Sequence, residues 1–129
     1  RGRIIVNLAV QDNIYKFQDV LKEYPKADVV NRHHFSDGMY AREMFMPANT
    51  CVVGAKHKTR HFYSVVKGEC SVVSVHERED IKAPFLGETL PGTKRIIYAH
   101  TDCIWITYHP TQLTNVEEIE KALVELEVI

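Results

Sequence analysis

The sequence has few cysteines, no excess of charge of one sign and no long apolar run. Its three cysteines lie far apart among 129 residues and form no C-x-x-C pair, which excludes a disulfide-rich scaffold and favours a reducing compartment. Sixteen Lys and Arg against seventeen Asp and Glu give a net charge of −1, which excludes a strongly basic nucleic-acid binder. No apolar run approaches the ~20 residues of a membrane-spanning helix. The apolar run Ile4–Val10 is short and contains Asn7, so we expect no secretory signal peptide and no membrane association.

The length and the apolar content of the chain predict one ordinary domain over residues 1–129. Hydrophobic residues make up 45% of the sequence, which excludes global disorder. A chain of this size buries roughly two-thirds of the surface of its unfolded state. That is enough for one core and too little for two.

Two segments, residues 11–24 and 115–127, have the apolar spacing of amphipathic helices. Asp12 is the expected N-cap of the first, and Thr114 with Glu117 forms a capping-box signature before the second. The apolar positions at 3-4-3 spacing are Ile14, Phe17, Leu21 and Tyr24 in the first segment and Val116, Ile119, Leu123 and Leu126 in the second. Such a narrow seam packs on the outside of a barrel or against a second copy, which favours a homo-oligomer.

Between the helices, residues 29–109 consist of short β-branched and aromatic runs separated by turn residues. The turns fall at Asp37-Gly38, Lys67-Gly68 and Pro91-Gly92. The mostly charged residues 77–82 are expected to form a solvated loop. About eight strands, with little room for crossover helices, predict an antiparallel barrel or sandwich.

The stretch Gly54–Glu69 resembles the first motif of the cupin superfamily. That motif consists of a histidine pair, a carboxylate and a strand that ends in a glycine turn. The first histidine of the pair falls at Ala55, the second at His57, and the carboxylate at His61. The stretch Gly87–Arg95 resembles a degraded second motif, and its metal-binding histidine falls on the final arginine of that stretch.

The resemblance covers roughly residues 39–109 and depends on the placement of glycine, proline and strands more than on ligands. It implies a mainly β fold, a cupin-like antiparallel jelly-roll barrel over residues 29–109 flanked by an N-terminal and a C-terminal α-helix. It also implies a divalent first-row metal ion (Fe, Zn, Ni or Mn) as the cofactor.

Two histidines and three candidate third ligands could form a metal site in this sequence. His57 and His61 have the same strand parity, so both side chains point inward if the strand pairing is regular. Neutral imidazoles bind such metals, and a site needs at least a third ligand. Glu43 would complete a two-histidine, one-carboxylate set, and His100 and His109 are the alternative third ligands, since all three lie on predicted strands or at their ends. The competing interpretation is that the histidines line the barrel without a metal.

Arg95 suggests a different site. If this arginine replaces a metal ligand in the barrel mouth, its guanidinium favours a carboxylate or phosphate ligand, and the adjacent Lys94 would add a second positive charge to a metal-free anion pocket. The alternative is a rim arginine paired with Glu88 or Asp102.

The chain is also similar to small cupin-like proteins encoded by bacteriophages and prophages. The shared features are Arg42-Glu43-Met44 with Pro47-Ala48, His57-Lys58-Thr59, Pro91–Arg95, Tyr98-Ala99-His100, and Trp105 followed by His109-Pro110-Thr111. This similarity implies a virion or host-cytoplasmic location. Because two expected ligand positions are lost, it favours a non-enzymatic barrel, virion-associated or accessory, that acts through its surfaces and its assembly with itself or other virion proteins. The alternative is a small metal-dependent cupin enzyme, an oxygenase or isomerase, that uses His57 and His61.

Overall fold

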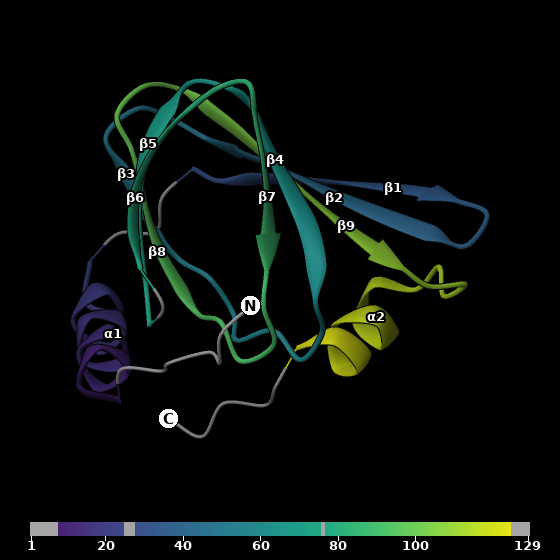
Figure 1. Cartoon of the computed structure of the whole chain (residues 1–129), viewed down its shortest axis with the longest axis horizontal. Helices are drawn as coiled ribbons and strands as arrows, with labels where there is room; N and C mark the ends of the chain where they lie inside the picture. Colours follow the sequence, from purple (N-terminus) through teal and green to yellow (C-terminus); the bar gives the residue numbers. More distant parts are fainter. Residues whose placement is uncertain (1–7, 25–27, 76, 125–129) are drawn as a thin grey trace, which may run out of the picture.

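Two antiparallel sheets face each other in the computed structural model, which describes residues 8–24, 28–75 and 77–124 (Figure 1). Their orders are β1-β2-β9-β4-β7 and β3-β8-β5-β6. The strands are β1 (Val30–Ser36), β2 (Met39–Met46), β3 (Thr50–Val53), β4 (His61–Lys67), β5 (Glu69–Ser74), β6 (Arg78–Lys82), β7 (Phe85–Thr89), β8 (Arg95–Ala99) and β9 (Cys103–Pro110). Helices α1 (Leu8–Leu21) and α2 (Val116–Leu123) flank them, so the mainly β barrel with two terminal helices is confirmed.

The register of the five-stranded sheet decides which side chains enter the barrel. Strand β2 pairs with β9 so that Tyr40 lies opposite His109 and Arg42 opposite Thr107. Side chains alternate between the two faces of a strand. Because Tyr40 and Met46 are buried, the even-numbered residues of β2 face inward and its odd-numbered residues face outward.

The core lies between the two sheets and is formed by aromatic, aliphatic and thiol side chains. Its buried members are Met46, Tyr63, Val65, Cys70, Val72, Ile81, Ile97, Ala99, Cys103 and Trp105. The Tyr63 and Trp105 rings stack with centroids 4.3 Å apart and an interplanar angle of 2°. Gly87 lies opposite Tyr63 in the register, and a Cβ there would come within 2.6 Å of the tyrosine ring. Glycine is therefore the residue that lets this ring lie flat in the core.

Helix α1 begins and ends three residues earlier than the predicted segment, 11–24. Asp12 therefore lies inside the helix, and the N-cap prediction is wrong. At the C-terminal end the amide of Tyr24 donates to the Leu21 carbonyl at 3.1 Å, an i→i−3 bond that closes the last turn. Of the predicted apolar seam, Ile14 is buried while Phe17 and Tyr24 are 36% and 63% exposed, so the seam packs on the barrel mainly through one residue.

Helix α2 is capped by Asn115 rather than by the predicted Thr114. The Asn115 side chain accepts a hydrogen bond from the Glu118 amide at 3.1 Å. The helix ends at Leu123, and the predicted seam residue Leu126 lies outside the described residues. Ile119 is 2% exposed and holds the helix against the end of the barrel near β9 (Figure 1). No helix in the described ranges has the length and apolarity needed to cross a membrane.

The charged segment 77–82 is not the loop that its composition predicts. Residues 78–82 form β6, an edge strand paired with β5, and Ile81 within it is 3% exposed. The Ser71 hydroxyl donates to the Asp80 carboxylate at 2.7 Å across the pair. One buried apolar side chain and the backbone pairing thus outweigh the polar composition, because an edge strand needs to bury only one face.

Candidate functional site

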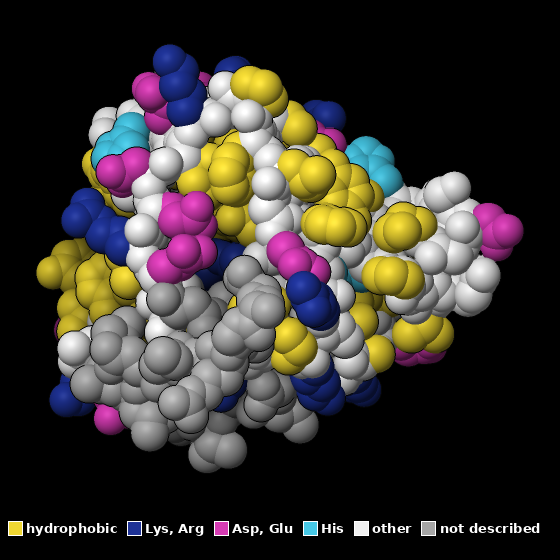
Figure 2. Space-filling model, in the orientation of Figure 1, with side chains coloured by type: hydrophobic (Ala, Val, Ile, Leu, Met, Phe, Trp, Pro, Cys, Tyr) yellow, Lys and Arg dark blue, Asp and Glu magenta, His cyan; other side chains and the backbone are white. Residues whose placement is uncertain are grey.

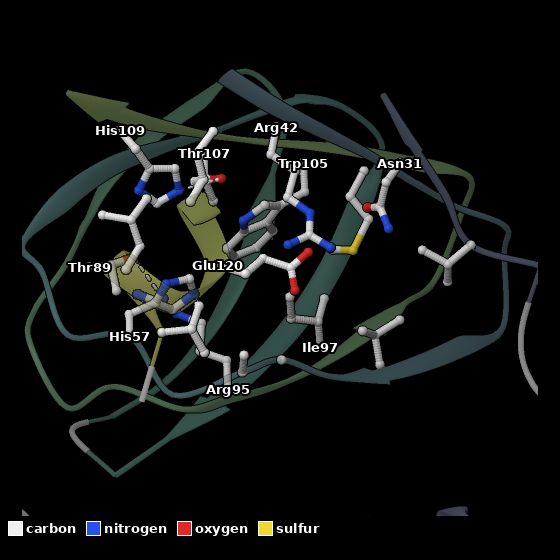
Figure 3. A pocket seen from close by; sticks show the side chains of 18 of the residues that line it. Asn31, Arg42, His57, Thr89, Arg95, Ile97, Trp105, Thr107, His109 and Glu120 are labelled. Atoms are coloured by element: carbon white, nitrogen blue, oxygen red, sulfur yellow. Dashed lines mark hydrogen bonds between the residues drawn. The ribbon is translucent and has the colours of Figure 1, made fainter. Parts of the chain in front are cut away.

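A cavity of about 330 Å³ opens at the end of the barrel beside α2 (Figure 3). Both sheets and the helix contribute to its walls. Its apolar wall is built by Val29, Met44, Val52, Ile97 and Trp105. Ile97 and Trp105 are also buried members of the core, and Val29, Met44 and Val52 pack against it. The volume falls at the small end of the range typical of ligand pockets.

Three histidines cluster beside this cavity. The centroid of the His61 ring lies 4.6 Å from that of His57 and 4.3 Å from that of His109, and the remaining pair is 6.0 Å apart. His57 follows β3 and forms a single antiparallel bridge with Val124. His61 begins β4, and His109 lies near the end of the neighbouring strand β9. Strand pairing therefore joins residues far apart in the sequence into one group.

Each ring of this cluster has one buried nitrogen without a hydrogen-bond partner among the residues that the structure describes. These nitrogens are Nδ1 of His57, Nε2 of His61 and Nδ1 of His109. The His61 Nδ1 donates to the Thr59 carbonyl at 3.0 Å, which leaves the lone pair of neutral His61 on Nε2. The His109 Nε2 lies 3.0 Å from the Thr107 hydroxyl. Buried polar atoms are usually paired, so three orphaned nitrogens in one cluster point to a missing partner.

The electrostatics of the cluster keep its imidazoles neutral. Burial lowers the pKa of His57 to about 3, and the neighbouring His61 and His109 act in the same direction. Burial also lowers the pKa of His109 to about 4 and lowers the pKa of His61. At neutral pH all three rings are uncharged, which is the form that binds metal ions.

The donor chemistry of the cluster fits a first-row divalent metal. Three neutral imidazoles are suitable ligands for Fe, Ni or Zn, and the hydrogen bond from His61 to Thr59 is the kind of outer contact that orients such a ligand. Within the described residues, no group of three or more His, Cys, Asp or Glu side chains is already arranged to hold a metal ion. The rings must therefore turn their free nitrogens toward a common point for binding.

The predicted third ligands Glu43 and His100 do not join the cluster. Glu43 is an odd-numbered residue of β2, and its carboxylate lies 3.0 Å from the His34 Nε2 on the outer face of the sheet. His100 is exposed after β8, with its Nε2 2.6 Å from the Ser71 hydroxyl. Of the three candidates, only His109 lies beside His57 and His61.

Only one of the two residues predicted to bind an anion, Arg95 and Lys94, lies at the cavity. Arg95 lines the cavity and donates to the Thr89 hydroxyl at 2.8 Å, and its guanidinium carbon lies 4.7 Å from the Tyr63 ring centroid. It does not pair with Glu88, which binds Arg60 instead. Lys94 is 1% exposed, donates to the Gly54 carbonyl at 2.9 Å and lies outside the cavity wall. Lys94 therefore belongs to the packing of the fold.

Two charged side chains that the sequence analysis did not select also line the cavity, Arg42 and Glu120 (Figure 3). Arg42 lies on the inner face of β2, and strand alternation with Tyr40 and Met44 is the signal that would have found it. Glu120 reaches in from α2 and stays solvent-exposed at the mouth. Its position depends on how the helix docks, for which the sequence carries no signal.

Comparisons with known proteins identify the fold. No family model and no curated protein matches the chain. A cupin superfamily protein from Desulfitobacterium hafniense has a TM-score of 0.56 at 10% identity, over 69% of this chain and 84% of its own. A mutant of salicylate 1,2-dioxygenase from Pseudoaminobacter salicylatoxidans has a TM-score of 0.59 at 12% identity, over 93% of this chain and 39% of its own. An acetylacetone dioxygenase from Acinetobacter johnsonii has a TM-score of 0.55 at 13% identity, over 67% of this chain and 65% of its own. The chain therefore has a cupin-like fold.

Proposed function

We propose that the chain is a small metal-dependent enzyme of the oxygenase class, with His57, His61 and His109 as the metal ligands. The observation that carries this proposal is the set of three buried imidazole nitrogens, one from each histidine, that lack a hydrogen-bond partner within the described part of the chain. The lowered pKa values support it, because the rings need not lose a proton to bind a cation at neutral pH. The similarity to the folds of two dioxygenases supports the reaction class.

The residues around the cluster have separate tasks in this proposal. A bound metal supplies a redox and Lewis-acid centre next to the cavity. The Thr59 carbonyl holds His61 in one orientation, and the Thr107 hydroxyl contacts His109. The apolar wall that includes Trp105 binds the body of the substrate and excludes water from it.

Metal analysis of the purified protein tests the proposal. We expect about one equivalent of iron, nickel, zinc or manganese per chain after reconstitution and gel filtration, as for any single three-ligand site. The His57→Ala, His61→Ala double variant should lose it. The matched control is His100→Ala, which removes an exposed histidine outside the cluster and should keep the metal. A wild-type chain that binds none of these metals after reconstitution would refute the proposal.

The second candidate is the virion-associated or accessory role, which requires a surface for assembly. The outer face of β4 and β7 supports it, since Phe62, Val66 and Leu86 are 56%, 50% and 65% exposed. Leu86 lies opposite Ser64, between the other two, so these side chains form one patch, and hydrophobic side chains gather over these strands in Figure 2. Light scattering after gel filtration should show an oligomer that Leu86→Asp dissociates and that Val30→Asp, on the far edge strand, leaves intact. A monomeric wild type contradicts this role.

A further inference from the structure

The charged side chains that line the cavity carry a net positive charge. Arg42 and Arg95 contribute two guanidiniums to its wall, and Glu120 contributes one carboxylate. These groups leave a net charge of +1 in a small, partly enclosed space. A ligand with a single negative charge would neutralise it.

The two arginines differ in how much of their hydrogen-bonding capacity is used. Arg95 is held by the Thr89 hydroxyl and by the faces of Tyr63 and Trp105. Arg42 forms no hydrogen bond or ion pair with any part of the chain that the structure describes. A half-buried guanidinium that lines a cavity and has no partner among the described residues is suited to a carboxylate, which it can bind through two parallel hydrogen bonds.

The carboxylate at the mouth limits what kind of anion fits. Glu120 lines the same cavity and forms no ion pair with Arg42 among the described residues. Figure 3 shows its side chain directed from α2 toward the middle of the cavity. A ligand with a second negative charge, such as a dicarboxylate or a phosphate monoester, would be repelled by it. The apolar wall, with Met44, Val52 and Ile97, requires an apolar body next to the charged group.

We propose that the cavity binds a small monocarboxylate with an apolar body, that Arg42 anchors the carboxylate, and that Glu120 disfavours ligands with a second negative charge. The inference deepens the proposed function by naming its substrate class. It differs from the anion site predicted from the sequence, because Lys94 faces away and the anchor lies on β2.

The test uses the full chain freed of metal with a chelator, so that its outcome does not depend on the histidine site. Calorimetric titration compares three probes of similar size, namely benzoate, the neutral benzamide and the dianion phthalate. The wild type should bind benzoate at least tenfold more tightly than benzamide or phthalate. Hydrogen bonds to a charged group are worth about this factor or more. Equal affinity for benzoate and benzamide, or no binding of benzoate, overturns the proposal.

Variants separate the two charged residues. Arg42→Gln should lower the affinity for benzoate at least tenfold and leave the affinity for benzamide unchanged. Glu120→Gln should raise the ratio of phthalate to benzoate affinity about three- to tenfold, a modest factor because this carboxylate is exposed to solvent. The matched control is Glu118→Gln, two residues earlier on α2 and outside the cavity wall, which should leave the ratio unchanged.

The outcomes distinguish this inference from the metal proposal. Benzoate affinity that survives Arg42→Gln, with the variant's circular dichroism and melting temperature unchanged, refutes the anchor. If the ratio of phthalate to benzoate affinity is the same in Glu120→Gln as in the wild type, Glu120 does not disfavour ligands with a second negative charge. If metal analysis finds no bound metal but the wild type still prefers benzoate, the metal proposal fails and this inference stands. The chain is then a metal-free barrel that binds a monocarboxylate.

Discussion

Acidification from pH 7 to pH 4 should strongly destabilise the folded chain through its histidine cluster. In the unfolded chain a histidine titrates near its ordinary pKa of 6.5, whereas in the folded chain the pKa is about 3 for His57 and about 4 for His109. Between these values the unfolded state binds more protons than the folded state. Stability is therefore fully present above pH 6.5 and falls as the pH falls toward 3.

The size of this effect follows from the width of the pH window. One pKa unit corresponds to about 1.4 kcal/mol of differential stability. From pH 7 to pH 4, the contribution of each of these histidines to the free energy of unfolding falls by roughly 3 kcal/mol, since the unfolded form becomes protonated over about 2.5 pH units. Folded His57 stays mostly unprotonated over this range, and folded His109 is about half protonated at pH 4. The pair together therefore accounts for roughly 6 kcal/mol, which is comparable to the ~5–15 kcal/mol total stability of a typical domain.

Urea unfolding followed by circular dichroism, with a chelator present, measures this loss. The free energy of unfolding should decrease steeply below pH 6.5 in the wild type. His57→Gln removes one titrating group and should reduce the part of the pH dependence that His57 and His109 contribute by about half. His100→Gln, which alters a histidine outside the cluster, should retain the wild-type profile. A wild-type free energy that stays flat between pH 6.5 and pH 4 would refute the argument that the cluster is buried in its neutral form.

Three further predictions concern packing and capping. Gly87→Ala should destabilise the chain by about 1–3 kcal/mol, because the new Cβ overlaps the buried Tyr63 ring, whereas Gly54→Ala, with its nearest contact at 3.8 Å, should have little effect on the melting temperature. Asn115→Ala removes the cap of α2 and should cost about 1 kcal/mol in urea unfolding. Ile119→Ala should cost about 2 kcal/mol or more and speed amide exchange across α2, since this residue docks the helix.

Each of these predictions has a contrary outcome. Equal melting temperatures for the two glycine variants would mean that the Tyr63 ring can move aside. An unchanged free energy of unfolding in Asn115→Ala would mean that the Glu118 amide finds another partner, such as water. Wild-type amide exchange of α2 in Ile119→Ala would show that contacts other than this side chain hold the helix on the barrel.

Most of the fold was predictable from local patterns. Turn residues and β-branched runs located eight of the nine strands found in the described residues, and apolar spacing located both helices. The exception, β6, has a charged composition, and only its pairing with β5 makes it a strand. Helix ends were displaced by a few residues because capping depends on which side chain reaches a free amide, as Asn115 does for Glu118.

The candidate site was only partly predictable, and the reason is geometric. His57 and His61 share a parity that the sequence reveals, and that alternation also excludes Glu43 once the inward face of β2 is known. His109 lies 48 positions after His61, and only the pairing of β4 with β9 brings their rings within 4.3 Å.

By itself the sequence determined the alternation of each strand, the turns between strands and the class of the fold, because these depend on neighbouring residues. The tertiary structure alone decided which strands pair, how α2 docks, and hence which charges enter the cavity. Lys94 and Arg95 are adjacent in the sequence, yet one lies buried against the Gly54 carbonyl and the other lines the cavity. Lys94 directly precedes β8 and Arg95 begins it, so alternation along the extended chain separates their side chains, and only the packing of the two sheets defines which face is the inside.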